Sequence, residues 1–195
     1  MAFRIQDFRS QMALDGARYN LFECTMTFPG SVVANVNGVS EKFTFMCHSG
    51  QIPGSTVSPI PVNYFGRELK FAGNRTFPEW TVTIWNDEDF RLRNAFENWM
   101  NGINQHRFNL RNPALVSPVD YQQDGYVKQY GKTGDVLKAY KFIGMFPIDV
   151  SAIDLDWGTN DSIQEYASAI VLPCKYYRKY PKSWQNYGRG EGRNC

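Results

Sequence analysis

Histidine is scarce in this sequence: His48 and His106 are the two that occur among 195 residues. His48 directly follows Cys47, and because neighbouring strand residues point to opposite faces, the two form a poor chelating pair. The Gly-x-Ser-x-Gly nucleophile motif and the phosphate-binding Gly-rich loop are both missing. The Gly-Lys-Thr within 131–134 lacks the preceding glycine spacing and predicts a hairpin turn. We therefore expect no catalytic residues, no metal site and no cofactor.

Paired cysteine spacing and long apolar runs are also absent. The four cysteines follow no motif, and Cys24 and Cys47 fall in apolar patterns, where a free thiol behaves as a small hydrophobic side chain. This usage favours a reduced, cytosolic setting. No run approaches the roughly 18 to 20 apolar residues of a membrane-spanning helix. Residues 1–7 contain no apolar signal segment, so we do not expect Sec-type export.

Charge is nearly balanced, with a net charge of +2, but it is unevenly distributed. Residues 175–195 contain six basic residues and one acid, a net charge of +5, which leaves −3 for residues 1–174. The body is therefore mildly acidic and is followed by a basic segment, which we expect to be extended or disordered on its own.

Aromatic residues are abundant, at 15%, and alternating patterns predict a mainly β fold. We expect two packed antiparallel sheets that form a sandwich or barrel with one amphipathic helix at 87–102, whose apolar stripe includes Leu92, Phe96 and Trp99. A hairpin turn at Asn37–Gly38 is expected to join the first two strands. The predicted strands, seven or eight in number, are 20–28, 42–49, 67–72, 80–85, 125–130, 136–146 (ended by Pro147), 151–157 and 163–174.

The stretch from Ala72 to Asp89 joins three of the expected elements. Gly73–Asn74 predicts a turn, Trp80–Trp85 alternates as a strand, and Asn86 is placed to cap a helix whose first turn contains Asp87 and Asp89. The aromatic side chains also permit a second interpretation, a surface that stacks on sugars or bases. Trp80, Trp99 and Trp157 all fall on apolar faces of their predicted elements, however, and this favours a buried core.

The segment 50–76 is rich in proline and glycine, which favours a long loop or extended arm over a central strand. Loops of this length in compact domains are usually functional. The alternative is a segment that merely crosses a sheet corner.

The sequence A-G-N-R-T-F-P-E-W-T-V-T-I-W-N-D-E (72–88) resembles the central motif of the tail tube proteins of T-even-type contractile-tailed bacteriophages. Collinear agreement extends over about residues 18–175 and includes Asn20-Leu21-Phe22, Phe43-Thr44-Phe45, Ile60-Pro61-Val62, Ile143-Gly144 and Leu155-Asp156-Trp157. The segments 29–41 and 107–123 are longer than this family leads us to expect, and the residues after Tyr177 look like an addition.

The resemblance implies a structural subunit of the virion that forms hexameric rings, which stack into a hollow tube through which DNA is ejected. Implied partners are the sheath protein outside, baseplate and terminator proteins at the ends, and phage DNA or a tape-measure protein in the lumen, without stable sequence-specific nucleic acid binding. Assembly would take place in the bacterial host cytoplasm. The alternatives are a baseplate tube-initiator protein, a type VI-like injection tube and a carbohydrate-binding β-sandwich.

The resemblance divides the chain into an N-terminal arm or short helix (1–17), the tube domain (18–175) and a basic extension (176–195). In a tube of this kind we expect the 50–76 arm to contact neighbouring subunits or rings, through the candidate residues Ile52, Pro53, Ile60, Pro61, Tyr64, Phe65, Arg67 and Arg75. DNA must slide through a tube without adhering, and basic linings bind phosphate strongly. We therefore expect a neutral or acidic lumen with Asp154 and Asp156, on the polar face of their expected strand, facing it. The alternatives are that these two residues form a carboxylate pair for acid–base chemistry, face solvent or contact a neighbour.

Overall fold

A computed structural model covers the chain and describes all residues except 1–3, 13–15, 32, 34–35, 173 and 179–195. The predicted basic extension lies outside the described residues from 179 onward. The helices are α1 (Ile5–Gln11), α2 (Val36–Met46), α3 (Arg91–Ile103) and α4 (Pro118–Tyr121), with a 3-10 turn at Pro113–Leu115. The strands are β1 (Phe22–Met26), β2 (Cys47–Gly50), β3 (Thr56–Tyr64), β4 (Arg67–Thr76), β5 (Trp80–Trp85), β6 (Gln123–Tyr130), β7 (Val136–Val150), β8 (Glu165–Val171) and β9 (Cys174–Arg178).

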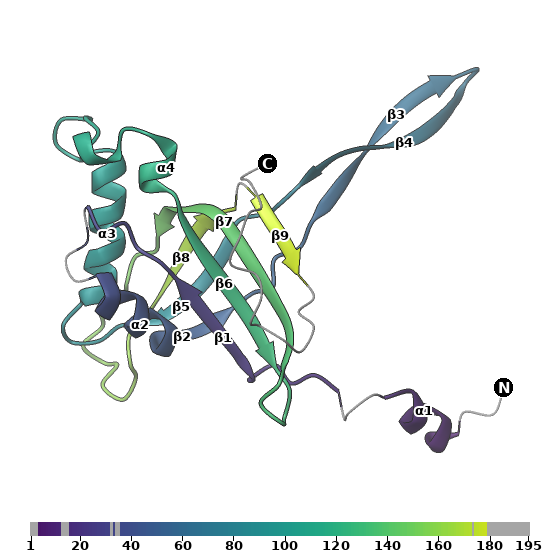
Figure 1. Cartoon of the computed structure of the whole chain (residues 1–195), viewed down its shortest axis with the longest axis horizontal. Helices are drawn as coiled ribbons and strands as arrows, with labels where there is room; N and C mark the ends of the chain where they lie inside the picture. The colour runs from purple at the N-terminus through teal and green to yellow at the C-terminus, as the bar shows by residue number, and fades with distance from the viewer. Residues whose placement is uncertain (1–3, 13–15, 32, 34–35, 173, 179–195) are drawn as a thin grey trace, which may run out of the picture.

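The expected mainly β fold with two antiparallel sheets is confirmed (Figure 1). Sheet A contains β1, β6, the first part of β7 and β9, and sheet B contains the last part of β7 with β8, β5 and β2. The long strand β7 passes from one sheet to the other near Gly144, where the pairing with β6 slips in register. Gly144 has a φ of 75°, a conformation that glycine adopts without steric penalty.

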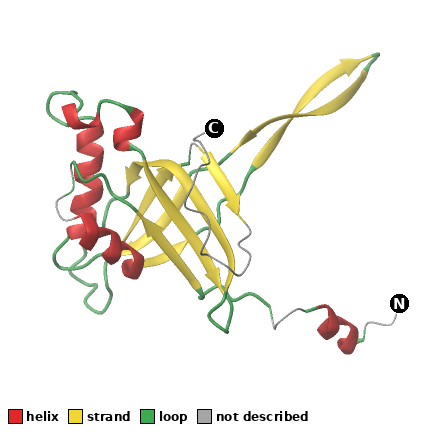
Figure 2. Ribbon diagram, viewed as in Figure 1, coloured by secondary structure: helices red, strands yellow, loops and turns green. Residues whose placement is uncertain are grey.

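The core lies between the sheets and continues under α2 and α3, which lie with α4 on one side of the strands, whereas α1 stands apart near the N-terminus (Figure 2). The alternation predicted for β5 is confirmed, since Trp80, Val82 and Ile84 are fully buried. The helical stripe is confirmed in α3, where Leu92, Phe96 and Trp99 are buried. In the described part of the chain, no helix is long and apolar enough to span a membrane.

The strand predicted at 42–49 and the turn predicted at Asn37–Gly38 are wrong, because both fall mainly within helix α2. Val39 and Phe43, one helical turn apart, are buried, whereas Phe45 is largely exposed. The Phe43 ring lies edge-on to Phe28 and to Phe96 of α3, each at 6.3 Å. Packing of the helix onto this aromatic cluster therefore overrides the local alternation.

The predicted start of the central helix is also wrong, because α3 begins at Arg91 and not at residue 87. The carboxylates of Asp87 and Asp89 instead lie 2.7 and 2.6 Å from the Lys42 ammonium group of α2. Asp89 also accepts a hydrogen bond from the backbone N–H of Arg91. Asp87 and Asp89 thus link α2, through Lys42, to the segment that leads into α3.

The strand predicted at 151–157 is wrong, because β7 continues through Pro147 to Val150 and residues 151–156 form a loop. Pro147 pairs with Ile170 of β8 and is buried, so it does not end the strand as predicted. Strand β8 pairs with β7 on one side and with β5 on the other. Because β8 has no free edge left, a strand at 151–157 could not pair with it.

Candidate functional site

The candidate site is a projecting hairpin formed by β3 and β4, which leaves the body from between the neighbouring strands β2 and β5 of sheet B (Figure 1). The two strands pair only with each other. At its foot, the indole nitrogen of the buried Trp80 donates a hydrogen bond of 2.8 Å to the Gln51 carbonyl oxygen. The extended arm expected at 50–76 is thus observed, and most of it is a two-stranded β-ribbon instead of a loop.

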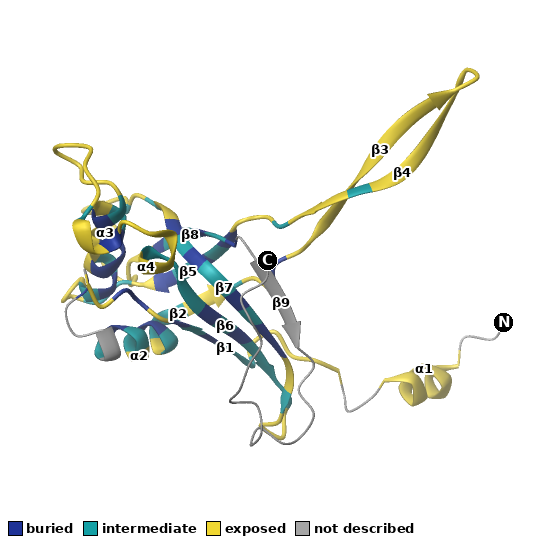
Figure 3. Ribbon diagram, turned by 45° about the horizontal axis from the view of Figure 1, so that its top comes forward, coloured by how far each residue is buried: buried dark blue, intermediate teal, exposed yellow. Residues whose placement is uncertain are grey.

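The hairpin has one apolar face. Cross-strand partners share a face, so Ile60 lies beside Phe71 and Val62 lies beside Leu69. These four side chains, which we call the apolar face, are between 44% and 56% exposed (Figure 3). The opposite face carries proline, lysine and other polar residues, in the pairs Pro59–Ala72, Pro61–Lys70 and Asn63–Glu68.

The tip of the hairpin is an aromatic turn. Phe65 and Gly66 both have positive φ values, 46° and 75°, as a two-residue turn of the I′ type requires. A bulky residue rarely adopts this conformation, and Phe65 is 88% exposed. Its ring lies edge-on to that of Tyr64, with the centroids 4.5 Å apart. Backbone strain at an exposed aromatic residue is typical of a functional surface.

The turn predicted at Gly73–Asn74 is wrong, because both residues lie within β4. The register between Val57 and Pro59 slips opposite this position. A Cβ atom on Gly73 would lie only 2.9 Å from Cγ1 of Ile60. Glycine at position 73 therefore allows the two strands to approach closely at a bulge, and the chain does not turn there.

The structure brings most of the predicted contact residues together on this hairpin. Ile60, Pro61, Tyr64, Phe65, Arg67 and Arg75 are exposed on it, and Ile52 is exposed at its foot. Pro53 is buried and so belongs to the anchor of the hairpin. Sequence reasoning missed Val62, Leu69 and Phe71, although their alternation with polar residues was a usable signal.

The arginines of the hairpin are available for contacts. Within the described residues, neither Arg67 nor Arg75 takes part in an ion pair or a side-chain hydrogen bond, whereas Lys70 lies 3.6 Å from Glu68. Arg67 stands opposite Tyr64 at the tip, and Arg75 stands opposite Val57 nearer the foot. Two unpaired guanidinium groups thus flank the apolar face.

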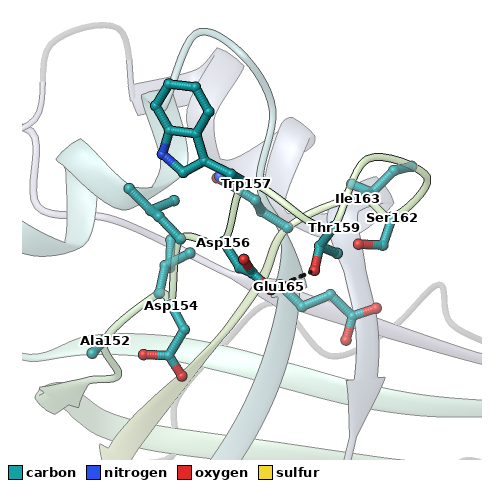
Figure 4. A pocket seen from close by; sticks show the side chains of 11 residues that line it. Ala152, Asp154, Asp156, Trp157, Thr159, Ser162, Ile163 and Glu165 are labelled. Carbon is teal, nitrogen blue, oxygen red and sulfur yellow. Dashed lines mark hydrogen bonds between the residues drawn. The ribbon is translucent and has the colours of Figure 1, made fainter.

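The other two predicted residues, Asp154 and Asp156, lie on the 151–164 loop, beside an open hollow of about 650 Å³ (Figure 4). Asp156 accepts hydrogen bonds from the Gly158 N–H at 3.0 Å and the Thr159 hydroxyl at 3.4 Å, so it fixes its own turn. Asp154 makes no such bond within the described residues and is exposed. Leu155 and Trp157 beside them are also exposed.

The outward face of sheet B, which ends at this loop, carries small uncharged side chains at its centre and, at one end, Glu165 with His48 3.0 Å away. Thr81 pairs with Ala169 and Thr83 pairs with Ala167, and all four are partly exposed. The segment 148–165 contains five acidic residues and no basic residue. This side of the subunit is therefore neutral to acidic.

The outward face of sheet A is different, because it carries lysines in ion pairs. Lys128 lies 3.1 Å from Glu23, and Lys141 lies 3.0 Å from Asp124. Burial opposes ionisation of Glu23, but hydrogen bonds from Tyr130 and Lys128 outweigh it and hold the pKa of Glu23 below its ordinary value. Burial and the hydrogen bond to Glu23 raise the pKa of Tyr130 to about 12.

Among the residues that the structure describes, no three His, Cys, Asp or Glu side chains gather closely enough to hold a metal ion. The two most regular features are an exposed apolar ribbon and a sheet face with threonine and alanine at its centre. Both are suited to contacts with other macromolecules.

Comparison with known sequences gives a consistent result. A family model described as phage tail tube protein matches residues 17–171. The tail tube protein gp19 of Enterobacteria phage T4 is 31% identical over 159 residues, which cover 81% of this chain and 90% of that protein. The tail tube protein of Serratia phage KSP90 is 25% identical over 164 residues, with 83% and 90% covered.

Solved structures share the fold at low sequence identity. The cap that terminates the tube of the anti-feeding prophage has a TM-score of 0.60 at 15% identity, covering 87% of this chain and 95% of that one. A chain of the sheath–tube complex of the extracellular contractile injection system PVC has a TM-score of 0.54 at 12% identity, with 92% and 100% covered.

Proposed function

The chain belongs to the phage tail tube protein family, and on that premise we propose that its copies form hexameric rings that stack along one axis. It is a structural subunit of the tail tube and a component of the virion. We infer that the subunit acts by assembling with other subunits and catalyses no reaction. The observation that carries the proposed contact is the projecting hairpin with its exposed apolar face.

A hairpin of this kind is not expected to stand alone. An isolated two-stranded ribbon is marginally stable in water. Covering the exposed half of Ile60, Val62, Leu69 or Phe71 contributes about 1 kcal/mol for each side chain. We infer that the apolar face of one subunit packs on the body of a neighbour, in the same ring or the next one.

Such a contact is heterologous, because a projecting element of one copy meets a different surface of another. Repetition of a heterologous contact produces closed rings or open stacks. Prolines at 59 and 61 cannot donate to an added strand, so they limit uncontrolled edge-to-edge pairing of the ribbon. Arg67 and Arg75 would meet acidic groups of the neighbour.

The lumen is proposed to be lined by the outward face of sheet B. Short side chains such as Thr83 and Ala167 offer no cation to a passing phosphate backbone. Asp154 and Asp156, at the edge of this face, would add negative charge to the lining. The ion-paired lysines of sheet A and the basic residues after 178 would then lie away from the lumen.

The remaining partners follow from this placement. We propose that the sheath protein surrounds the tube, that baseplate and terminator proteins bind its ends, and that DNA or a tape-measure protein occupies the lumen transiently. The PVC sheath–tube complex supports the first of these by similarity of fold. Assembly in the host cytoplasm belongs to the same proposal.

A second candidate is a baseplate protein that initiates the tube, or the tube of another injection system. A baseplate chain of the anti-feeding prophage shares the fold, with a TM-score of 0.59 at 11% identity. Negative-stain microscopy separates the candidates, because a tube subunit forms long stacks and an initiator forms isolated rings. Monomers would indicate the carbohydrate-binding alternative.

The experiment that tests the hairpin contact replaces Ile60 by aspartate, a charge that the proposed packing cannot accommodate. The matched control is Ala72→Asp, which adds the same charge on the opposite face of the same ribbon. We expect Ile60→Asp to give folded subunits, by circular dichroism, that form no tubes, whereas Ala72→Asp assembles. Equal assembly of the two variants would exclude the apolar face as a contact.

A further inference from the structure

Two free cysteines lie where the open edges of the two sheets meet. In the sheet order β1-β6-β7-β8-β5-β2, strands β1 and β2 are the two ends. Cys24 is in the middle of β1 and Cys47 is the first residue of β2. Both side chains belong to the same hydrophobic core. The two end strands are therefore joined through side chains, since no backbone ladder pairs them.

The sulfur atoms of this pair both lie beside Gly50. Each residue carries a free thiol, and the Cys47 thiol donates a hydrogen bond of 3.6 Å to the Ser49 carbonyl oxygen. Gly50 provides the space for them: a Cβ atom on Gly50 would lie 2.9 Å from the Cys24 sulfur and 4.0 Å from the Cys47 sulfur. A larger residue at position 50 would displace the Cys24 side chain.

We propose that Cys24 and Cys47 are an oxidative modification site, at which a disulfide oxidant converts the two thiols into an intramolecular disulfide bond between β1 and β2. This bond would close the sheet order covalently. It does not depend on rings or tubes, because both residues belong to one subunit.

The two thiols differ in access, which sets the order of steps. Cys47 is partly exposed, whereas Cys24 is 1% exposed. The Cys47 thiol and burial together raise the pKa of the Cys24 thiol far above its ordinary value. Cys47 is therefore the thiol that an external oxidant reaches first.

With oxidised glutathione as the oxidant, the reaction balances in two exchanges. The Cys47 thiolate attacks one glutathione sulfur, a mixed disulfide forms, and the first glutathione leaves as a thiolate that takes up a proton. Cys24 then loses its proton and attacks the Cys47 sulfur, which releases the second glutathione. Two protein thiols are oxidised and one glutathione disulfide is reduced to two thiols.

The expected consequence is a more stable subunit in oxidising surroundings. Disulfides persist outside cells and are kept reduced in the cytosol. A cross-link that closes a loop of this length stabilises by restricting the unfolded chain, which for a domain of this size corresponds to a rise in Tm of roughly 5–10 °C.

The test uses the purified, full-length chain as a monomer. One sample is kept in dithiothreitol and one is incubated with oxidised glutathione, and both are alkylated while folded, digested without reduction and mapped by mass spectrometry. We expect a cross-linked peptide pair that contains Cys24 and Cys47, with a mass 2 Da below the sum of the reduced peptides, and a higher Tm in the oxidised sample.

The variant Cys47→Ser provides the matched control, because it removes the more accessible thiol and keeps the size of the side chain. In this variant we expect glutathione to leave Tm unchanged. Glutathione attached to Cys47 without a cross-link, pairing only through Cys174 or Cys195, or an unmodified pair in the wild-type chain would each overturn the proposal. The wild-type map decides the matter even if the variant folds poorly.

Discussion

The Trp80 indole nitrogen donates a hydrogen bond of 2.8 Å to the backbone carbonyl oxygen of Gln51, and this contact fastens the projecting hairpin to the core. The ring of Trp80 is fully buried and lies 5.1 Å from that of Phe142 of sheet A. One side chain thus packs between the sheets and also fixes the first leg of the hairpin. Stability of the body and orientation of the assembly surface are coupled at this residue.

Substitution of Trp80 tests this coupling. Trp80→Phe removes the hydrogen bond and leaves a cavity, so we expect a loss of about 2–3 kcal/mol in the free energy of unfolding, measured by denaturant titration of the monomer. Trp85→Phe is the control, since the Trp85 indole makes an equally short bond to Glu165 at the surface. Its loss should be below about 1 kcal/mol. Similar losses for both variants would contradict the proposed anchor.

Close packing at Gly125 gives a second prediction. A Cβ atom there would collide with the Met145 side-chain methyl and lie 2.9 Å from the Thr25 carbonyl oxygen of β1. The strands cannot both keep their positions, so Gly125→Ala should destabilise the subunit by about 1–3 kcal/mol. Gly54→Ala is the matched control, because a Cβ atom there meets nothing within 4 Å. Its thermal midpoint should stay within about 2 °C of the wild type.

The pair of Tyr130 and Glu23 predicts a dependence of stability on alkaline pH. Folding raises the pKa of Tyr130 from its ordinary 10.0 to about 12, so the folded state favours the neutral phenol. The resulting stability is fully present below pH 10 and is lost as the pH rises from 10 to 12. Because the site is partly open to solvent, we expect a contribution of about 1 kcal/mol.

Tyr130→Phe isolates this contribution. The difference in unfolding free energy between wild type and variant should be constant from pH 8 to 10 and should shrink by about 1 kcal/mol between pH 10 and 12. Urea denaturation at each pH provides the measurement. A difference that stays constant up to pH 12 would show that Tyr130 titrates normally in the folded chain.

The sequence predicted the elements whose pattern matches their surroundings. Strand β5 was predicted correctly because Trp80, Val82 and Ile84 alternate with threonine, and one face of the strand is buried. Helix α2 was missed because Phe43, Phe45 and Cys47 also alternate. The segment is helical because a helix packs Phe43 against Phe96 of α3, and this tertiary contact cannot be inferred from the local pattern.

The candidate site was predicted in part. Prolines at 59 and 61 correctly indicated an arm outside the main sheets. They did not indicate that the arm is a β-ribbon, because both strands of a two-stranded ribbon have a free edge, where proline is tolerated. The alternation of Leu69 and Phe71 with polar residues indicated one apolar side of a strand, but the cross-strand register that sets Phe71 beside Ile60 is not specified by the sequence. Asp154 and Asp156 were assigned to a strand whose partner edge is already occupied by β5 and β7.

The lumen assignment gives the last prediction. Replacing Asp154 and Asp156 together by lysine changes the charge by +4 in every subunit, so that repeated cations would line the proposed channel. We expect variant phage to assemble tubes but to release DNA roughly tenfold more slowly, since each lysine that neutralises a phosphate releases counterions and binds the strand. Release of DNA from triggered particles, followed by dye fluorescence, provides the measurement.

Two comparisons separate a lumen effect from a damaged loop. Asp154→Lys alone leaves the turn made by Asp156 intact, and we expect it to give a smaller delay of the same kind. Glu88→Lys changes an exposed acid just before α3 that is not part of the proposed lining, and it should release DNA at the normal rate. Counterion release also requires that the delay shortens as salt concentration rises. A delay that is independent of salt, or normal release by the double variant, would place these aspartates outside the lumen.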